Sequence, residues 1–250
     1  MKHQIAFLLI LTVSLIKAGE PADLMRTLEG FKGTTPITAK LNLQSWSEKT
    51  LKKKPIVKQG NISLLVTQNN LGLQTSLASR FIDQASRESL RSIKDSSPEQ
   101  PIRWLLKDLD YGRIHHLLDQ GETLQGIITN SKFTEEKSGR WEGQVVRIME
   151  FTYQPRLSPD ESFRLHHSEG HLVLRTNVDG LPLQSEIKEI YEGKTSRMFG
   201  RYQGSKWTET RYKVILDHLI VSERTVDDYL SKEDGSDITK TRQIYSVIPE

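Results

Sequence analysis

The stretch that determines the fold class runs Ile37-Thr-Ala-Lys-Leu-Asn-Leu-Gln44, with apolar and polar side chains in strict alternation. Because successive side chains on a strand point to opposite faces, this pattern predicts a strand with one buried face. The alternation returns at residues 62–66, and again at 71–77 after the turn residues Asn69-Asn70. We expect these three segments to be consecutive antiparallel strands.

The second half of the chain repeats the same period. Apolar and polar residues alternate in six further segments, which are residues 141–154, 172–176, 181–191, 197–213, 216–229 and 237–248. Turn residues such as Asp179-Gly180 separate them, and short strands joined by hairpins over about a hundred residues are typical of a meander.

Two helical regions interrupt the strands. Leu24, Met25, Leu28 and Phe31 are spaced for one face of a short helix that ends at Gly30 or Gly33. Residues 79–120 are too apolar for a loop, and we expect an insert of short helices that ends at Gly121, with strands resuming after Leu124. The predicted fold class is therefore α+β: a curved antiparallel sheet, or half-barrel, with an N-terminal helix and a helical insert covering its concave face.

Several short motifs support a resemblance. The chain contains Leu117-Leu118-Asp119, a Gly139-to-Gly143 hairpin, Asp179-Gly-Leu-Pro-Leu-Gln184 and a Val214-to-Ser222 strand pair. The order of elements resembles the periplasmic lipoprotein-carrier type of half-barrel: a helix, three strands, a helical insert and then a long meander that contains the Asp179-to-Gln184 motif. The motifs together resemble uncharacterised secreted bacterial proteins. The carrier resemblance implies a concave apolar face that receives acyl chains. The chain departs from such proteins at Asp217-His218, where they often have Asp-Arg, and no binding or catalytic residue is transferred.

The N-terminus has the layout of a secretory signal peptide. Residues 1–4 form a basic head, an apolar run of twelve residues follows, and small residues come next at Ala18-Gly19. Such a run is shorter than the roughly 20 residues that span a bilayer, so we expect cleavage after about residue 18 and no transmembrane segment afterwards. Residues 19–250 then form a single domain. The chain has no cysteine, which favours export into a bacterial periplasm or to the outside of a bacterium.

The charge balance excludes some partners. Without Lys2 and Lys17 of the leader the chain has 33 basic and 32 acidic side chains, so its net charge is about +1. No general field attracts nucleic acid, and we predict no nucleic-acid partner. No cofactor motif is present, because a phosphate-binding glycine loop with its lysine and helix is missing.

The sequence has few groups for catalysis. There is no cysteine nucleophile and no Gly-x-Ser-x-Gly elbow, which favours a protein that is not an enzyme. The segment 166–171 holds three histidines and a glutamate, but we interpret it as a solvated turn rather than a metal site. His115 and His116 are expected on a helix, one packed and one solvated. The acidic pair Asp227-Asp228 is placed beside a hairpin, where it cannot flank a sugar.

Aromatic side chains recur in neighbouring strands. They are Trp141, Phe151, Tyr153, Phe199, Tyr202, Trp207 and Tyr212. Core packing explains them best, and a stacking platform for bases or sugars is the alternative.

These observations favour an exported, non-enzymatic binding protein that holds a lipid or another hydrophobic ligand. Seven apolar residues are predicted to form its site on the concave face and the insert: Leu41, Leu43, Leu64, Val66, Trp104, Leu105 and Leu109. One alternative is a structural or interaction module of the cell envelope without a ligand. A third is a metal-dependent hydrolase using the histidine segment.

Overall fold

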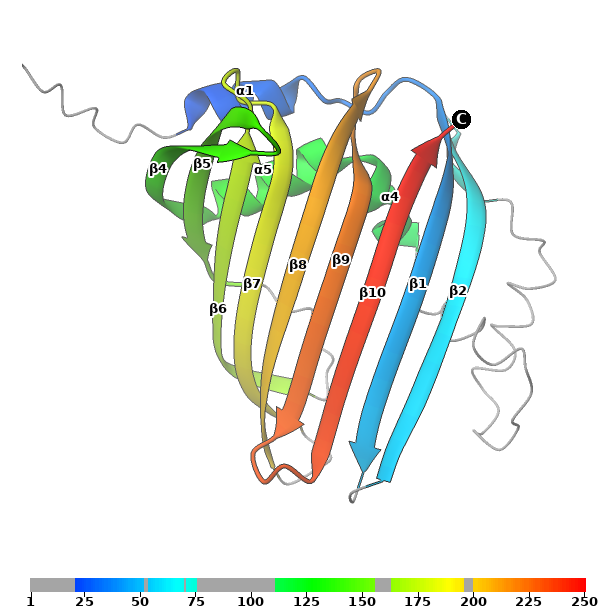
Figure 1. Cartoon of the computed structure of the whole chain (residues 1–250), viewed down its shortest axis with the longest axis vertical. Coiled ribbons are helices and arrows are strands. Elements are labelled where there is room, and N and C mark those ends of the chain that lie inside the picture. The colour runs from blue at the N-terminus through cyan, green and yellow to red at the C-terminus, as the bar shows by residue number, and fades with distance from the viewer. Residues whose placement is uncertain (1–20, 52–53, 70, 76–110, 156–162, 196–199) are drawn as a thin grey trace, which may run out of the picture.

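The computed structural model describes residues 21–51, 54–69, 71–75, 111–155, 163–195 and 200–250 (Figure 1). The described strands are β1 (Ile37–Leu51), β2 (Lys54–Asn69), β3 (Gly72–Thr75), β4 (Ser131–Trp141), β5 (Gln144–Tyr153), β6 (Phe163–Thr176), β7 (Pro182–Thr195), β8 (Arg201–Ile215), β9 (His218–Lys232) and β10 (Asp237–Pro249). The described helices are α1 (Ala22–Glu29), α4 (Tyr111–Leu118) and α5 (Gln120–Thr129).

All ten strands belong to one antiparallel sheet in the order β3-β2-β1-β10-β9-β8-β7-β6-β5-β4. Strands β4 to β10 form a meander, and β1 pairs with β10, so that Leu43 lies opposite Tyr245. The first and last described strands are therefore neighbours in the interior of the sheet. The sheet is not closed, because β3 and β4 form its two edges.

Local sequence signals account for these elements. The first three strands and the meander were predicted, and both predictions are confirmed. Gly143 and Gly180 adopt the positive φ values of 83° and 85° that their hairpin turns require, which glycine does without steric cost. The predicted N-terminal helix is confirmed as α1, which ends at Gly30.

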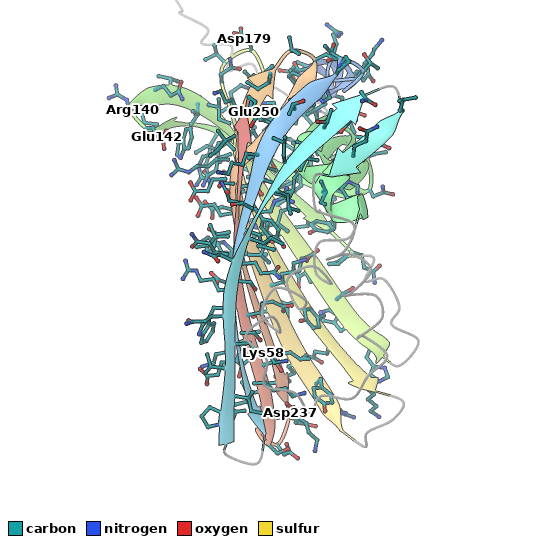
Figure 2. All side chains as sticks on the ribbon, turned by 90° about the vertical axis from the view of Figure 1, so that its right-hand side faces the viewer. Lys58, Arg140, Glu142, Asp179, Asp237 and Glu250 are labelled. Atoms are coloured by element: carbon teal, nitrogen blue, oxygen red, sulfur yellow. The ribbon has the colours of Figure 1, made fainter. Side chains whose placement is uncertain are left out.

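One face of the sheet carries the helices, and we call it the helix face. Ile114, Leu117 and Leu118 of α4 join a buried cluster with residues of β1, β2, β9 and β10. A second cluster joins α1 and α5 to β5, β6 and β9. Figure 1 shows α4 and α5 behind the strands, and Figure 2 shows them on one side of the sheet. We call the opposite face the open face.

The predicted end of the helical insert is wrong. Gly121 does not end a helix but lies in α5, and helix continues past Leu124 to Thr129. The reason is tertiary: Leu124 and Ile128 are buried in the second cluster, and this burial outweighs the poor helix propensity of two glycines. Trp104, Leu105 and Leu109 of the insert lie outside the described residues.

Two further local predictions are wrong. The histidine segment 166–171 is not a turn but part of β6, where His167 pairs with Glu192 and His171 with Lys188. Asp227 and Asp228 lie within β9, away from its hairpin, and neighbouring residues on a strand point to opposite faces.

The predicted signal peptide lies outside the described residues. Along the described part of the chain, no helix is both long enough and apolar enough to cross a membrane.

Candidate functional site

A row of paired residues crosses the open face. Trp46 on β1 lies opposite Arg242 on β10, which pairs with Asp227 on β9. Asp227 pairs in turn with Trp207 on β8, and Trp207 pairs with Lys188 on β7. Two indole rings thus flank an arginine and an aspartate on four adjacent strands. Three strand spacings separate the tryptophans, which is about 14 Å.

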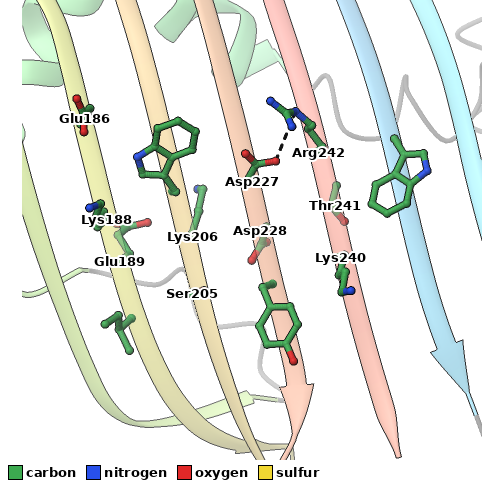
Figure 3. A pocket seen from close by; sticks show the side chains of 14 residues that line it. Glu186, Lys188, Glu189, Ser205, Lys206, Asp227, Asp228, Lys240, Thr241 and Arg242 are labelled. Atoms are coloured by element: carbon green, nitrogen blue, oxygen red, sulfur yellow. Dashed lines mark ion pairs between the residues drawn. The ribbon is translucent and has the colours of Figure 1, made fainter. Parts of the chain in front are cut away.

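A second row lies beside the first. Lys240 pairs with Tyr229, Tyr229 with Ser205, and Ser205 with Ile190. The two rows border a groove with a volume of about 720 Å³, shown in Figure 3. We call it the open-face groove, and its lining residues are Trp46, Glu186, Lys188, Glu189, Ile190, Ser205, Lys206, Trp207, Asp227, Asp228, Tyr229, Lys240, Thr241 and Arg242.

The groove combines apolar walls with charge. Ile190 is 54% exposed and Tyr229 39% exposed, although both are large apolar or aromatic side chains. Arg242 Nε lies 3.7 Å from Asp227 Oδ1, a distance that gives a loose ion pair between exposed groups. Lys188 and Lys240 form no ion pair with any described residue. A ligand with an apolar body and an anionic group would match this lining.

The four predicted concave-face residues lie together on the helix face. Leu41, Leu43, Leu64 and Val66 are each at most 3% exposed and share one buried cluster. Leu117 and the other apolar residues of α4 belong to the same cluster. The expectation that these residues face the helical insert is confirmed for α4. Whether they hold a ligand stays a prediction.

A partly buried cation fixes α5 to the sheet. Arg224 on β9 donates from Nη2 to Gln120 Oε1 on α5 at 2.7 Å, and from Nε to Thr210 Oγ1 at 3.0 Å. Burial lowers the pKa of Arg224, because its guanidinium is removed from water. Next to it, Tyr212 Oη lies 2.6 Å from Ser185 Oγ, and burial raises the pKa of this phenol. Through Gln120, Arg224 positions α5 on the sheet.

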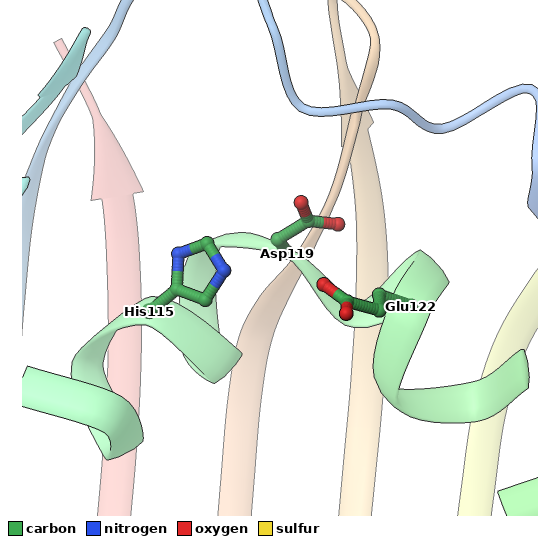
Figure 4. Close-up of side chains that lie close together, drawn as sticks. All are labelled: His115, Asp119 and Glu122. Atoms are coloured by element: carbon green, nitrogen blue, oxygen red, sulfur yellow. The ribbon is translucent and has the colours of Figure 1, made fainter. Parts of the chain in front are cut away.

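The connection between α4 and α5 gathers groups that can bind a metal. His115, Asp119 and Glu122 each place a ligand atom within 4.8 Å of the others (Figure 4). Asp119 is 6% exposed, and burial raises the pKa of its carboxyl group. His218, at the start of β9, is fully buried beside it.

The sequence predictions missed both places for one reason. The groove brings Trp46 and Trp207 together through the β1–β10 pairing. The connection between α4 and α5 brings Asp119 next to His218, the first residue of β9. Each pair is distant in the sequence. The only local signals were the exposed-face parity of Trp46 and Trp207 within their strands, and the closeness of His115, Asp119 and Glu122 in the sequence.

Comparisons with known proteins add little. The sequence matches no family model and no curated protein. Among solved structures, a DUF1329 family protein from Desulfovibrio piger ATCC 29098 is similar at a TM-score of 0.26 and 10% identity, over 88% of each chain. This similarity is too low to carry an argument about fold or function. The resemblance to lipoprotein carriers is not confirmed by these comparisons and stays a prediction.

Proposed function

We propose that this chain is an exported, non-enzymatic binding protein that holds an anionic amphiphile in the open-face groove. The main support for this proposal is the row in which Trp46 and Trp207 flank the exposed Arg242–Asp227 pair. Aromatic side chains supply large apolar contact at a low cost in conformational entropy, and exposed cations nearby supply selectivity for an anionic group.

The two halves of such a ligand have separate contacts in the groove. Its apolar body lies on the indole rings and on Ile190, which is exposed to water in the free protein. Its anionic group lies near Lys188 or Lys240, whose ammonium groups have no acidic partner among the described residues. Lipids and fatty acids of the bacterial envelope have this chemistry.

The location of the protein belongs to the same proposal. The basic head and apolar run at residues 1–18 support export to the periplasm or the cell exterior. A half-barrel of the lipoprotein-carrier type is the corresponding fold proposal, supported by the open antiparallel sheet with helices on one face.

A second site for the same function is the helix face. Leu41, Leu43, Leu64 and Val66 form a continuous apolar surface there, which favours a hydrophobic ligand. Because Leu117 and its neighbours on α4 cover this surface, a ligand reaches it only if α4 moves away. In that arrangement α4 acts as a lid.

Binding of 11-(dansylamino)undecanoic acid, followed by dansyl emission, tests the proposal. Trp46→Ala and Trp207→Ala should each weaken binding at least tenfold, equivalent to about 1.4 kcal/mol. Ile248→Ala is the matched control, because Ile248 is 53% exposed on β10 but does not line the groove. Lys240→Gln should weaken binding of the acid more than that of its methyl ester.

Two results would reject the groove. Wild-type protein that does not bind the acid, and carries no lipid when purified from the periplasm, would favour a structural module of the envelope. If both tryptophan variants still bind the acid as the wild type does, the result would indicate that the ligand binds on the helix face.

A further inference from the structure

The junction between α4 and α5 contains a set of metal-ligand groups that the groove does not use. His115 lies in α4, Asp119 lies between the two helices, and Glu122 lies in the first turn of α5. Their nearest ligand atoms lie within 4.8 Å of one another (Figure 4). His115 is half-buried, Asp119 is buried and Glu122 is exposed.

The buried atoms at this junction lack hydrogen bonds. Asp119 Oδ1 and His218 Nδ1 are both inaccessible to solvent, and neither has a hydrogen-bond partner among the described residues. A buried polar atom without a partner costs roughly 1–3 kcal/mol, and native proteins hold few of them.

The two side chains face the same small space beside Gly33. A methyl group at Gly33 would lie 2.4 Å from Asp119 Oδ2 and 3.3 Å from His218 Nδ1. Gly33 has a φ of 60°, so the backbone there also favours glycine. The space between the carboxylate and the imidazole is kept free of a side chain.

The tautomer of His218 makes this arrangement informative. Its Nε2 lies 2.6 Å from the carbonyl oxygen of Thr35, which can only accept, so Nε2 donates. In a neutral imidazole Nδ1 is then a bare acceptor. A bare acceptor beside a buried carboxylate requires a positive charge, either a proton or a cation.

We propose that His115, Asp119 and Glu122 bind a divalent transition-metal ion of the zinc class, with His218 Nδ1 beside the site. One imidazole and two carboxylates are ligands that Zn²⁺ accepts, with bonds of about 2.0–2.2 Å. In the tetrahedral geometry that Zn²⁺ prefers, two ligand atoms lie about 3.4 Å apart, so the three side chains, whose ligand atoms lie within 4.8 Å of one another, must close by up to about 1.4 Å. Glu122 is exposed and free to make this adjustment.

The environment of Asp119 supports a cation at this place. Asp119 is 6% exposed, and its Oδ1 has no hydrogen-bond partner among the described residues. A bound ion would offset the loss of hydration. It would also hold the end of α4 against the start of α5, because His115 lies in α4 and Glu122 in α5.

Zinc titration of the full-length mature protein tests the site. Calorimetry should show one equivalent of Zn²⁺, and Co²⁺ should give visible absorption bands of a bound ion. At free Zn²⁺ a hundred times Kd, Tm should rise by about 5–10 °C. His115→Gln should weaken binding at least tenfold and abolish the cobalt bands.

His116→Gln is the matched control, because His116 is the next residue of α4 but is exposed and directed to Thr123 Oγ1 at 3.0 Å. It should bind Zn²⁺ like the wild type. Asp119→Asn, whose folding is checked by circular dichroism, should lose Zn²⁺ binding as well.

Three results would overturn the proposal. These are no Zn²⁺ binding by the wild type, equal binding by the His115 and His116 variants, or a nitrogen-15 NMR spectrum in which His218 is doubly protonated and unchanged by Zn²⁺. The last result would assign the positive charge to a proton shared between Asp119 and His218.

Discussion

At the scale of single residues, Asp217 shows how one carboxylate organises a chain crossing. Its Oδ2 accepts hydrogen bonds from Thr34 N and Thr34 Oγ1, both at 2.8 Å, and its Oδ1 accepts from Thr35 N at 3.1 Å. These bonds fasten the segment before β1 to the turn between β8 and β9. The hydrogen bonds from Thr35 and Thr34 hold the pKa of Asp217 well below its usual range.

Replacing Asp217 should therefore reduce stability in a pH-dependent way. Because the folded pKa is depressed, the contribution is present above about pH 4 and is lost as the pH falls through the lower, folded value. Asp217→Ala should cost about 2 kcal/mol of unfolding free energy at pH 7, since several hydrogen bonds to a charged group are lost. Urea unfolding at pH 7 and at pH 3 measures both effects.

Asp179→Ala provides the control for this prediction. Asp179 lies in another exposed turn at the same end of the sheet (Figure 2), and its carboxylate accepts no hydrogen bond from the described residues. Its loss should change stability by less than about 0.5 kcal/mol. Equal costs for the two variants at both pH values would contradict the role of Asp217.

At the scale of elements, α5 is the helix whose local sequence agrees least with its structure. Its glycines have different surroundings. A Cβ on Gly121 would lie 2.9 Å from Phe31 Cβ and 3.0 Å from the Phe31 carbonyl oxygen, whereas a Cβ on Gly126 would meet nothing within 4 Å. Gly121 therefore permits a close approach between α5 and the chain after α1.

Alanine at these two positions should act in opposite directions. Gly126→Ala should stabilise the protein by about 0.5–1 kcal/mol, because alanine is the better helix former. Gly121→Ala gains the same propensity but forces Phe31 away, and we expect net destabilisation by about 1–3 kcal/mol, as overpacking usually costs. Thermal unfolding monitored at 222 nm distinguishes them, and stabilisation by both variants would exclude the close approach.

The same helix shows which elements a sequence can predict. Hairpins such as Asp179-Gly180 are visible because the turn residue and the alternation around it are local. The helix α5 is not visible, since Gly121 and Gly126 lower its propensity, and burial of Leu124 and Ile128 against the sheet stabilises it. The histidine segment fails in the same way: Gly170 suggests a turn, but in β6 the Tyr153 ring lies over the space that a side chain there would take.

At the scale of the whole molecule, the decisive feature is the pairing of β1 with β10. It brings residues 37–51 beside residues 237–249 and completes both faces at once. On the open face it places Trp46 in the same row as Trp207. On the helix face it joins Leu41 and Leu43 to Val247 and Tyr245 in the cluster that α4 covers.

No part of this pairing could be derived from the sequence, because every strand of the sheet has a similar alternation and nothing local selects its neighbour. The class of fold and the composition of the faces were therefore predictable. The groove and the metal-ligand junction, which depend on long-range order, were not.

The last prediction decides whether α4 is a lid over the helix face or part of the core. Leu117 is 2% exposed and belongs to the cluster that includes Leu41 and Leu43. If α4 is core, Leu117→Asp buries an unpaired charge and should destabilise the whole domain by several kcal/mol. If α4 is a lid, the charge should instead release the helix, leave the sheet folded and change uptake of a hydrophobic probe on the helix face.

Thermal melting and dansyl emission separate these outcomes, with His116→Asp as the control, since His116 is exposed on the same helix and tolerates charge. We expect unfolding, because a cluster that spans β1, β2, β9, β10 and α4 without a break is a single core in which no one layer opens independently.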